Sequence, residues 1–364
     1  MKYALIPLTL LLSLFTVAQP AKLLSKSEKL AKEVEPKVIE WRHHFHQNPE
    51  LSNREFNTAE KIAEHLKSLG FEVQTGVAKT GVVAILKGDK PGPVIGLRAD
   101  IDALPVTERV DIPWASKVVS EYNGIESGVM HACGHDTHIS ILMGVAEVLS
   151  KMKSDLKGTV KFVFQPAEEG APPGEEGGAK LMVKEGVLKN PDVDVMFGLH
   201  INAQTNVGEI TYKPGGTMAA ADRFVMKIKG KQSHGSTPWT SVDPIMTASM
   251  IIQGLQTIIS RQTELTKEAA VISVGLIRGG VRNNIIPEEV EMIGTIRTLD
   301  PAMQDIIHEK IRKVAKSMAE SQGATVEVDI QKYVPVTYNN PELTAKAVSW
   351  LNNAAGAEHV NLRK

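Results

Sequence analysis

The sequence contains a single cysteine among its 364 residues, so no disulfide within the chain is available to stabilise it. It also lacks an excess of charge of either sign, because 41 basic and 42 acidic residues leave a formal net charge of -1. This balance excludes an electrostatic surface for nucleic acid or an anionic membrane, and we expect neither as a partner. With 42% hydrophobic residues the chain can bury a large core, and its length predicts two domains.

The apolar run 4–17 is too short to span a bilayer. It follows the positively charged Lys2 and ends at the small-residue stretch 16–18. This pattern is typical of a signal peptide, residues 1–18, that is removed near Ala18. A membrane anchor or a buried helix is the alternative. We therefore expect an exported protein, periplasmic or secreted, without a membrane segment in its mature form.

The one cysteine lies in the stretch 130–138, Met-His-Ala-Cys-Gly-His-Asp-Thr-His, which also holds three of the eleven histidines. A thiolate, imidazoles and a carboxylate this close together can supply several ligands to a divalent metal. Gly134 lets the backbone turn tightly, so Cys133 and His135 can face one ion. The alternative is a buried cysteine near incidental histidines. The density of ligand-type residues favours a metal site.

Two short apolar runs, 82–86 and 94–97, are typical of strands buried on both faces of a sheet. The second run leads directly into Asp100 and Asp102. Open α/β sheets place their sites at the carboxyl ends of buried strands, so these aspartates are candidate site residues. They could alternatively end the strand and cap a turn.

Two more predicted strands end in residues of the same kinds. The run 158–164 is followed by Glu168 and Glu169, and the run 194–199 is followed by His200. Paired glutamates are often simply solvated. These two follow an apolar strand, and Pro166 restricts the backbone that leads from the strand to them. We expect all these side chains to meet at one edge of the sheet.

Helical periodicity predicts helices on both sides of these strands. The first predicted helix carries His43, His44 and His46. Residues one and two positions apart fan out over different faces of a helix, so these histidines cannot share one ion. We interpret them as surface or helix-packing residues. The predicted helices cover residues 25–48, 55–69 and 139–149.

A second module begins near Asp222 and predicts the order β-α-β-β-α-β of a ferredoxin-like domain. Asp243-Pro244 and Asp300-Pro301 each suit an N-cap and a first helical position, and they predict where its two helices begin. The predicted fold class is α/β, a mixed sheet flanked by helices, with an inserted α+β ferredoxin-like lid. The predicted domains are a catalytic domain over 24–215, the lid over 216–331 and a return to the catalytic domain over 332–364. The lid strands are expected at 224–228, 271–277, 290–297 and 325–330.

With these segments identified, the chain resembles the amidohydrolases related to zinc-dependent carboxypeptidases and aminoacylases. Within that group it is most similar to the branch of hippurate hydrolases, N-acyl-amino-acid amidohydrolases and plant auxin-conjugate hydrolases. Several motifs in the family's order carry this resemblance. They are residues 46–51, 97–105, 130–138, 165–170, 198–200, 233–235, 284–287 and 294–297.

The resemblance implies a hydrolase with two divalent metal ions per subunit and a lid that also forms a homodimer. Glu168 matches the general base, and Asp102 matches a carboxylate behind the metal ligands. His234 is expected to act on the partner subunit's active site. The matching metal ligands are Cys133, His135, Glu169 and His200, and the matching substrate-binding residues are His234, Asn284 and Arg297.

The chain departs from the family pattern at two places. Asp100 stands where related enzymes have a metal-ligating histidine. Relatives also continue beyond the equivalent of Lys364, through a last metal-ligating histidine, and His359 lacks the matching context. We therefore expect either a fragment or an incomplete second metal site.

The expected function is metal-dependent hydrolysis of the amide bond of N-acyl amino acids, with water activated by the metal and Glu168. Thiolate and imidazole ligands favour zinc, and carboxylates also admit manganese, cobalt or nickel. Arg297 offers a fork suited to the free carboxylate of such a substrate. One alternative is a hydrolase with Cys133 as nucleophile and His135 or His138 as base. Another is a catalytically impaired fragment that only binds metal or dimerises.

Overall fold

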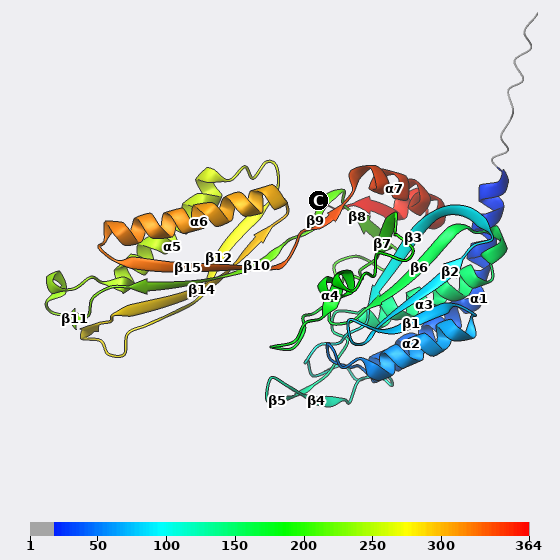
Figure 1. Ribbon diagram of the computed structural model, residues 1–364, viewed down its shortest axis with the longest axis horizontal. Helices are drawn as coiled ribbons and strands as arrows, with labels where there is room; N and C mark the ends of the chain where they lie inside the picture. The colour runs from blue at the N-terminus through cyan, green and yellow to red at the C-terminus, as the bar shows by residue number, and fades with distance from the viewer. Residues whose placement is uncertain (1–17, 364) are drawn as a thin grey trace, which may run out of the picture. The chain divides into compact units, whose positions relative to one another are not determined.

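The structure is a computed structural model that describes residues 18–363. Backbone contacts divide the chain into two compact units, one up to Gln204 and one from Thr205, and each is described by itself (Figure 1). Residues 1–17 of the predicted signal peptide lie outside the described part of the chain. Within the described part, no helix is both long and apolar enough to cross a membrane.

The first unit is built on a mixed five-stranded sheet in the order β1-β2-β6-β3-β7. The pairs β1/β2 and β2/β6 are antiparallel, whereas β6, β3 and β7 run parallel. Because parallel strands end at the same edge, the residues after β3, β6 and β7 are brought together. The strands are β1 (Glu72–Val77), β2 (Gly81–Lys87), β3 (Lys90–Asp100), β6 (Lys157–Gln165) and β7 (Val195–Gly198).

Helices cover both faces of this sheet, as predicted (Figure 1). One face carries Phe162 and Phe164 of β6, which pack against α2 and α3 in the larger core. The alternate side chain Val163 packs on the other face with Met182 of α4. The helix predicted over 139–149 begins earlier, at His135, so the metal-type residues stand at its first turns. The helices are α1 (Ala18–Gln47), α2 (Phe56–Ser68), α3 (His135–Ser150) and α4 (Gly178–Lys184).

The second unit contains the predicted ferredoxin-like arrangement. Its four strands form an antiparallel sheet in the order β12-β14-β10-β15, and α5 and α6 share an apolar core with it. Both helices begin as predicted, since Asp243 accepts hydrogen bonds from the Ile245 and Met246 amides and Asp300 accepts one from Met303. The elements are β10 (Ala221–Lys229), α5 (Pro244–Gln262), β12 (Ala270–Gly279), β14 (Glu289–Thr298), α6 (Pro301–Ser321) and β15 (Thr325–Val334).

Short elements complete both units. A hairpin of β4 and β5 precedes the cysteine stretch, and β11 pairs with β13 in the second unit. After β15, the chain returns to pair β16 with β9 and β17 with β8. The assignment of residues 332–364 to the catalytic domain remains a prediction. These elements are β4 (Val119–Tyr122), β5 (Ile125–Gly128), β8 (Ile210–Tyr212), β9 (Gly215–Met218), β11 (Ser233–His234), β13 (Ile285–Ile286), β16 (Thr337–Asn339), α7 (Pro341–Ala355) and β17 (Val360–Leu362).

Candidate metal centre

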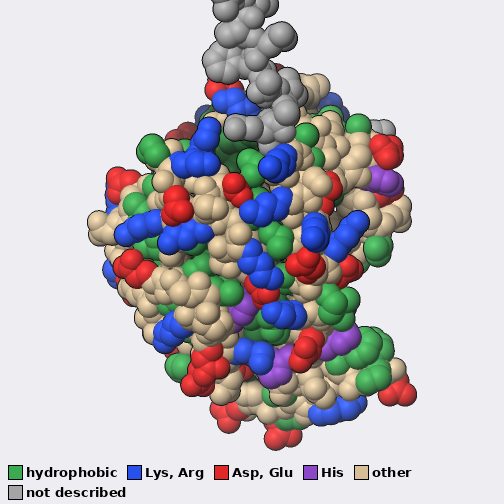
Figure 2. Space-filling view, turned by 90° about the vertical axis from the view of Figure 1, so that its right-hand side faces the viewer, with side chains coloured by type: hydrophobic (Ala, Val, Ile, Leu, Met, Phe, Trp, Pro, Cys, Tyr) green, Lys and Arg blue, Asp and Glu red, His purple; other side chains and the backbone are tan. Residues whose placement is uncertain are grey.

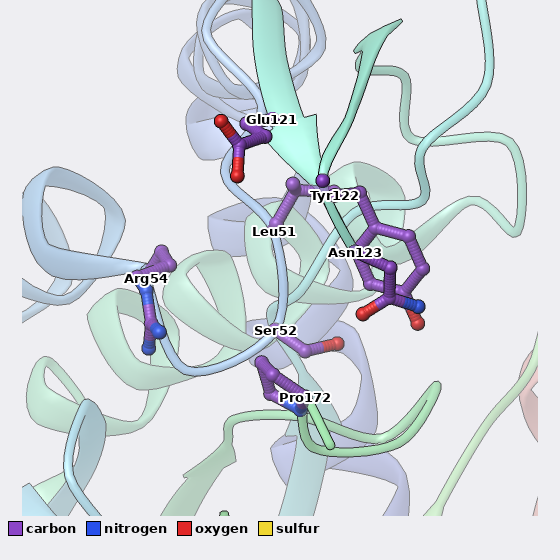
Figure 3. Close-up of a pocket in the computed structure, with 8 residues that line it drawn as sticks. Leu51, Ser52, Arg54, Glu121, Tyr122, Asn123 and Pro172 are labelled. Carbon is purple, nitrogen blue, oxygen red and sulfur yellow. The ribbon is translucent and has the colours of Figure 1, made fainter. Parts of the chain in front are cut away.

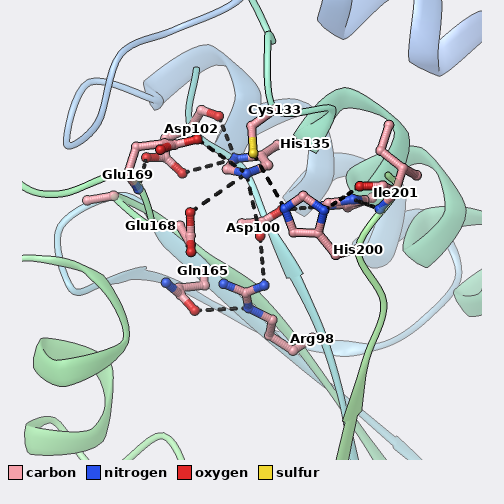
Figure 4. A network of polar contacts seen from close by, with 12 residues as sticks. Arg98, Asp100, Asp102, Cys133, His135, Gln165, Glu168, Glu169, His200 and Ile201 are labelled. Carbon is pink, nitrogen blue, oxygen red and sulfur yellow. Dashed lines mark hydrogen bonds and ion pairs between the residues drawn. The ribbon is translucent and has the colours of Figure 1, made fainter. Parts of the chain in front are cut away.

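The predicted ligands of the first unit converge at the carboxyl edge of its sheet (Figure 4). Asp100 ends β3, His200 follows β7 by two residues, and His135 begins α3. Glu168 and Glu169 follow the end of β6. Parallel pairing of β6, β3 and β7 therefore unites segments that are far apart in the sequence.

The turn before α3 depends on Gly134, which has a φ of 83° in the left-handed region. A Cβ atom at this position would lie 2.1 Å from Cδ1 of Ile201. The glycine thus permits the turn between Cys133 and His135 and the close approach of the chain beside His200. This confirms the tight turn predicted at Gly134.

Three sets of donor atoms could each hold an ion, with the atoms of each set within 4.8 Å of one another. His135 belongs to all three. The four predicted metal ligands are thus gathered around one imidazole, although no single set contains all four. The sets are Cys133, His135 and His200; Asp100, His135 and His138; and His135, Glu168 and Glu169.

The orientation of His135 fits a metal ligand. Its Nδ1 lies 2.8 Å from the Asp102 carbonyl oxygen and donates to it, so Nε2 is left to face the site. Nε2 is buried and has no hydrogen-bond partner among residues 18–363. It lies 3.8 Å and 3.9 Å from carboxylate oxygens of Glu168 and Glu169. A divalent cation at this position would bind the imidazole together with the neighbouring Glu169 carboxylate.

The electrostatics of the site also call for a cation. Burial disfavours a charged His135, yet the hydrogen bond with Asp102 and the charge of Asp100 outweigh burial and raise its pKa to about 9. The same negative field acts on Cys133, whose Sγ lies 3.4 Å from His200 Nε2. Burial, with the Glu169 carboxylate nearby, raises the pKa of the Cys133 thiol to about 12. Without a cation the thiol form of Cys133 is favoured, whereas a bound divalent cation would stabilise its thiolate.

Asp102 lies behind the donor atoms. Its Oδ2 accepts a hydrogen bond of 2.7 Å from Ser52 Oγ and one of 3.0 Å from the Glu169 amide. Burial acts to raise its pKa, but the hydrogen bonds with His135 and Ser52 prevail and lower it. Asp102 therefore stays ionised and orients both His135 and the glutamate turn.

Comparison with known proteins agrees with this geometry. Residues 96–363 match peptidase family M20/M25/M40. The chain belongs to this family. It is 40% identical to thermostable carboxypeptidase 2 of Saccharolobus solfataricus over 91% of this chain and 81% of that protein. It is 39% identical to N-acyl-L-amino acid amidohydrolase of Geobacillus stearothermophilus, over 82% and 77%.

Solved structures place the M20 chain in the same group. It matches the YXEP protein of Bacillus subtilis, described as a dinuclear metal-binding peptidase, with a TM-score of 0.75 and 37% identity. That match covers 91% of this chain and 82% of the other. The resemblance to this family, the fold class and the class of metal-dependent hydrolase predicted from the sequence are confirmed.

In this M20 peptidase, Asp100 is tied into a network that the sequence did not reveal. Its carboxylate accepts hydrogen bonds of 2.7 Å from Arg98 Nη1 and 2.6 Å from His138 Nδ1. His138 Nε2 in turn accepts a bond of 2.9 Å from the Ile201 amide, next to His200. Burial opposes the charge of Asp100, but His138 and Arg98 lower its pKa. His138 belongs to the cysteine stretch and lies three residues after His135 on α3. Residues at this spacing share one face of a helix, and this was the signal in the sequence that the two rings would lie close together.

The three histidines of α1 belong to none of the donor sets found among residues 18–363. His46 is buried, with Nδ1 3.0 Å from Asp136 and Nε2 3.1 Å from Glu108. His43 stacks on Trp114 with ring centroids 3.7 Å apart. The packing interpretation holds for His46, but its two carboxylate partners were not foreseen because both are distant in the sequence.

The predicted substrate-binding residues lie in the second unit. The Gly235 amide donates to the Asn284 carbonyl, which places His234 beside Asn284. Arg297 donates to Thr295 Oγ1 and to the Ile296 carbonyl and has no carboxylate partner within the described chain. Its side chain borders a cavity of about 350 Å³ that is also lined by Arg223. Among residues 18–363, Arg297 therefore forms no salt bridge at this strand edge.

A smaller cavity of about 230 Å³ lies beside the metal-ligand edge, between the β4–β5 hairpin and the loop after the glutamates (Figure 3). Ser52, which donates to Asp102, is on its wall. The cavity is thus a polar recess next to the site. The residues lining it are Leu51, Ser52, Arg54, Glu121, Tyr122, Asn123, Gly124 and Pro172.

Proposed function

We propose that this chain is a metal-dependent amidohydrolase that cleaves N-acyl amino acids to a carboxylic acid and a free amino acid. The observation that carries the proposal is the buried Nε2 of His135, which has no hydrogen-bond partner among residues 18–363 and faces carboxylate oxygens of Asp100, Glu168 and Glu169. Relatives named for this chemistry support it, among them hippurate hydrolase of Campylobacter jejuni, 38% identical over 83% of this chain and 74% of that protein.

Cys133, His135, Glu169 and His200 are the residues that would hold two divalent ions. When bound, such ions polarise the substrate carbonyl and lower the pKa of water. The thiolate and imidazoles favour zinc, while the carboxylates also admit manganese, cobalt or nickel. Elemental analysis of the purified protein would identify the metal and its stoichiometry.

Glu168 is the general base of the proposed reaction. Burial and the nearby Asp100 carboxylate raise its pKa, which makes it better able to accept a proton from water near neutral pH. It then donates that proton to the departing amine, which would otherwise be a poor leaving group. The adjacent Glu169 is turned towards the metal ligands, because Asp102 binds its amide. The two glutamates thus divide the work of base and ligand.

Arg297, with His234 and Asn284, is proposed to bind the substrate. Arg297 is free to form a bidentate pair with the carboxylate of an N-acyl amino acid. Carboxypeptidase relatives act on peptides, whose terminal carboxylate lies next to an amide in the same way. Blocking this carboxylate as an amide should raise KM sharply, and an unchanged KM would count against the pose.

The decisive experiment is Glu168→Gln, assayed on a panel of N-acyl amino acids and dipeptides. We expect kcat to fall by roughly 10²- to 10⁴-fold while metal content stays intact, because only the proton acceptor is removed. Glu176→Gln, on the exposed loop that follows, is the matched control and should leave kcat unchanged. Full activity of Glu168→Gln would refute the assignment.

We further propose that the protein is exported after removal of residues 1–18 and forms a homodimer through the lid. His234 would then act on the partner subunit's site. Sequencing the mature N-terminus tests export. Light scattering on the purified protein tests the dimer, and mixing His234→Ala with Glu168→Gln tests the shared site, because a mixed dimer would recover activity.

A further inference from the structure

The catalytic glutamate lies between two amides that are each held by a buried carboxylate. The Ala167 amide donates to Glu55 Oε1 over 2.9 Å, and the Glu169 amide donates to Asp102 Oδ2 over 3.0 Å. These bonds fix the backbone directly before and after Glu168. Asp102 lies two residues after the end of β3, whereas Glu55 precedes α2, so two separate segments of the chain hold the turn.

The turn needs such support, because Ala167 has a φ of 47°. A residue with a Cβ atom is strained in this left-handed region and stays there only when its surroundings impose it. Pro166 precedes it and cannot donate a hydrogen bond, so the Ala167 amide is the first on this turn that can be anchored. Glu55 supplies that anchor.

Glu55 is itself fixed by its surroundings. Its side chain is fully buried, and its second oxygen accepts a hydrogen bond of 2.6 Å from Thr80 Oγ1. Burial raises the pKa of Glu55 to about 7, so the fold retains a carboxyl group at this position despite the cost of burying its charge. Both oxygens are used, one towards the Thr80 turn and one towards the catalytic turn.

We propose that Glu55 is a positioning residue that holds Ala167 in its left-handed conformation and thereby aims Glu168 at the metal-ligand edge of the site. The inference rests on the proposed role of Glu168 as base. Glu55 and Asp102 act as a pair, one on each side of the base. Asp102 also contacts His135, whereas Glu55 reaches the reaction only through the backbone of this turn.

The first test is Glu55→Ala. Loss of the anchor should lower kcat by roughly 10- to 100-fold, as expected when a catalytic group is displaced by about 1 Å. KM and metal content should change little, since neither the lid residues nor the metal ligands touch Glu55. Hydrogen exchange of a peptide covering 165–171 should become faster. Glu55→Gln keeps an acceptor for the Ala167 amide and should restore most of kcat.

The second test separates positioning from general stability. Glycine adopts positive φ without strain, so adding Ala167→Gly to Glu55→Ala should recover at least several-fold of the lost kcat. Ala167→Gly alone is the reference with which the double variant is compared. If Glu55→Ala lowered kcat but glycine gave no recovery, or if Glu55→Ala retained full kcat, the inference would be overturned. Should Glu55→Ala not fold, Thr80→Val weakens the same link more mildly and should show the same recovery by glycine.

Glu50→Ala is the matched control. Glu50 is a nearby glutamate whose carboxylate accepts hydrogen bonds from the Asn57 and Thr58 amides at the start of α2 and makes none to the Ala167 amide. Its loss should lower thermal stability and leave kcat unchanged. A fully active Glu168→Gln would defeat the proposed function itself, whereas an inactive Glu168→Gln with a fully active Glu55→Ala would defeat only this inference.

Discussion

The two units share one building plan, helices packed on a β-sheet, but they bury very different residues. In the unit from Thr205, the core between the sheet and α5 and α6 is apolar, and one polar cluster joins β10 to α6. The unit up to Gln204 has an equally apolar core, yet one edge of its sheet buries a concentration of charged and imidazole groups. The polar cluster of the second unit consists of Asp222, Gln304 and His308. The buried charged and imidazole residues at the sheet edge of the first unit include Glu55, Asp100, Asp102, His131, His135, Asp136 and His138.

Burying so many polar groups is costly, because each loses its hydration. In the first unit the cost is tolerated at the edge where strands end, while the core beneath it stays apolar. The second unit shows that the same kind of layered fold needs no such edge. We therefore expect the first unit to carry the chemistry, and four predictions test that expectation.

The largest expected effect comes from removing metal. Treatment with EDTA should abolish hydrolysis, with a loss of about a thousandfold or more, because several kcal/mol of transition-state stabilisation disappear. Adding zinc or manganese back should restore it. Thermal melting should shift for the first unit only. Inhibition by iodoacetamide that is independent of metal would instead favour Cys133 as nucleophile.

Next in size is Phe224→Ala in the core of the second unit. Phe224 is fully buried, so its removal should cost about 3–5 kcal/mol of that unit's free energy of unfolding. Metal content should remain unchanged. Hydrogen exchange of α5 and α6 peptides in denaturant measures the loss. Phe56, 62% exposed, is the control, and Phe56→Ala should stay within about 0.5 kcal/mol.

The pH dependence of Glu55→Gln tests the cost of the polar edge. Folding raises the pKa of the buried Glu55 carboxyl from 4.5 to about 7, so the folded protein loses stability as the pH increases through that window. Below pH 4.5 the wild type and Glu55→Gln should be equally stable. Above pH 7 the unfolding free energy of the variant should exceed that of the wild type by up to about 3 kcal/mol. A difference that does not vary with pH, in chemical denaturation from pH 4 to 8, would contradict the prediction.

The smallest effect is expected for Asp222→Asn, in the polar cluster of the second unit. Asp222 Oδ2 lies 2.7 Å from His308 Nε2 and 2.8 Å from Gln304 Nε2. Loss of the charge should cost about 1–2 kcal/mol of unfolding free energy without affecting metal content. Asp305, which lies on α6 like Gln304 and His308, forms an exposed ion pair with Lys332 of β15, and Asp305→Asn should have no measurable effect. Loss of metal by Asp222→Asn would break the comparison between the units.

Local patterns in the sequence predicted most of the architecture. Short apolar runs predicted the buried strands β2, β3 and β6, and the aspartate-proline pairs predicted where α5 and α6 begin. These features are local, since a cap or a strand depends on neighbours within a few residues. The gathering of ligands at one edge was also predictable, because carboxylates and histidines follow strands that could be recognised individually.

The amino-acid sequence by itself therefore determined the two layered units, the kinds of side chains at the sheet edge and the family to which the chain belongs. Only the tertiary structure decided which of those side chains pair. The contact of Ile201 with His138 spans 63 residues and that of Ala167 with Glu55 spans 112. Such pairs are set by strand order and by the packing of loops at the edge. Residue type states what bond a side chain can form, but only the fold supplies its partner.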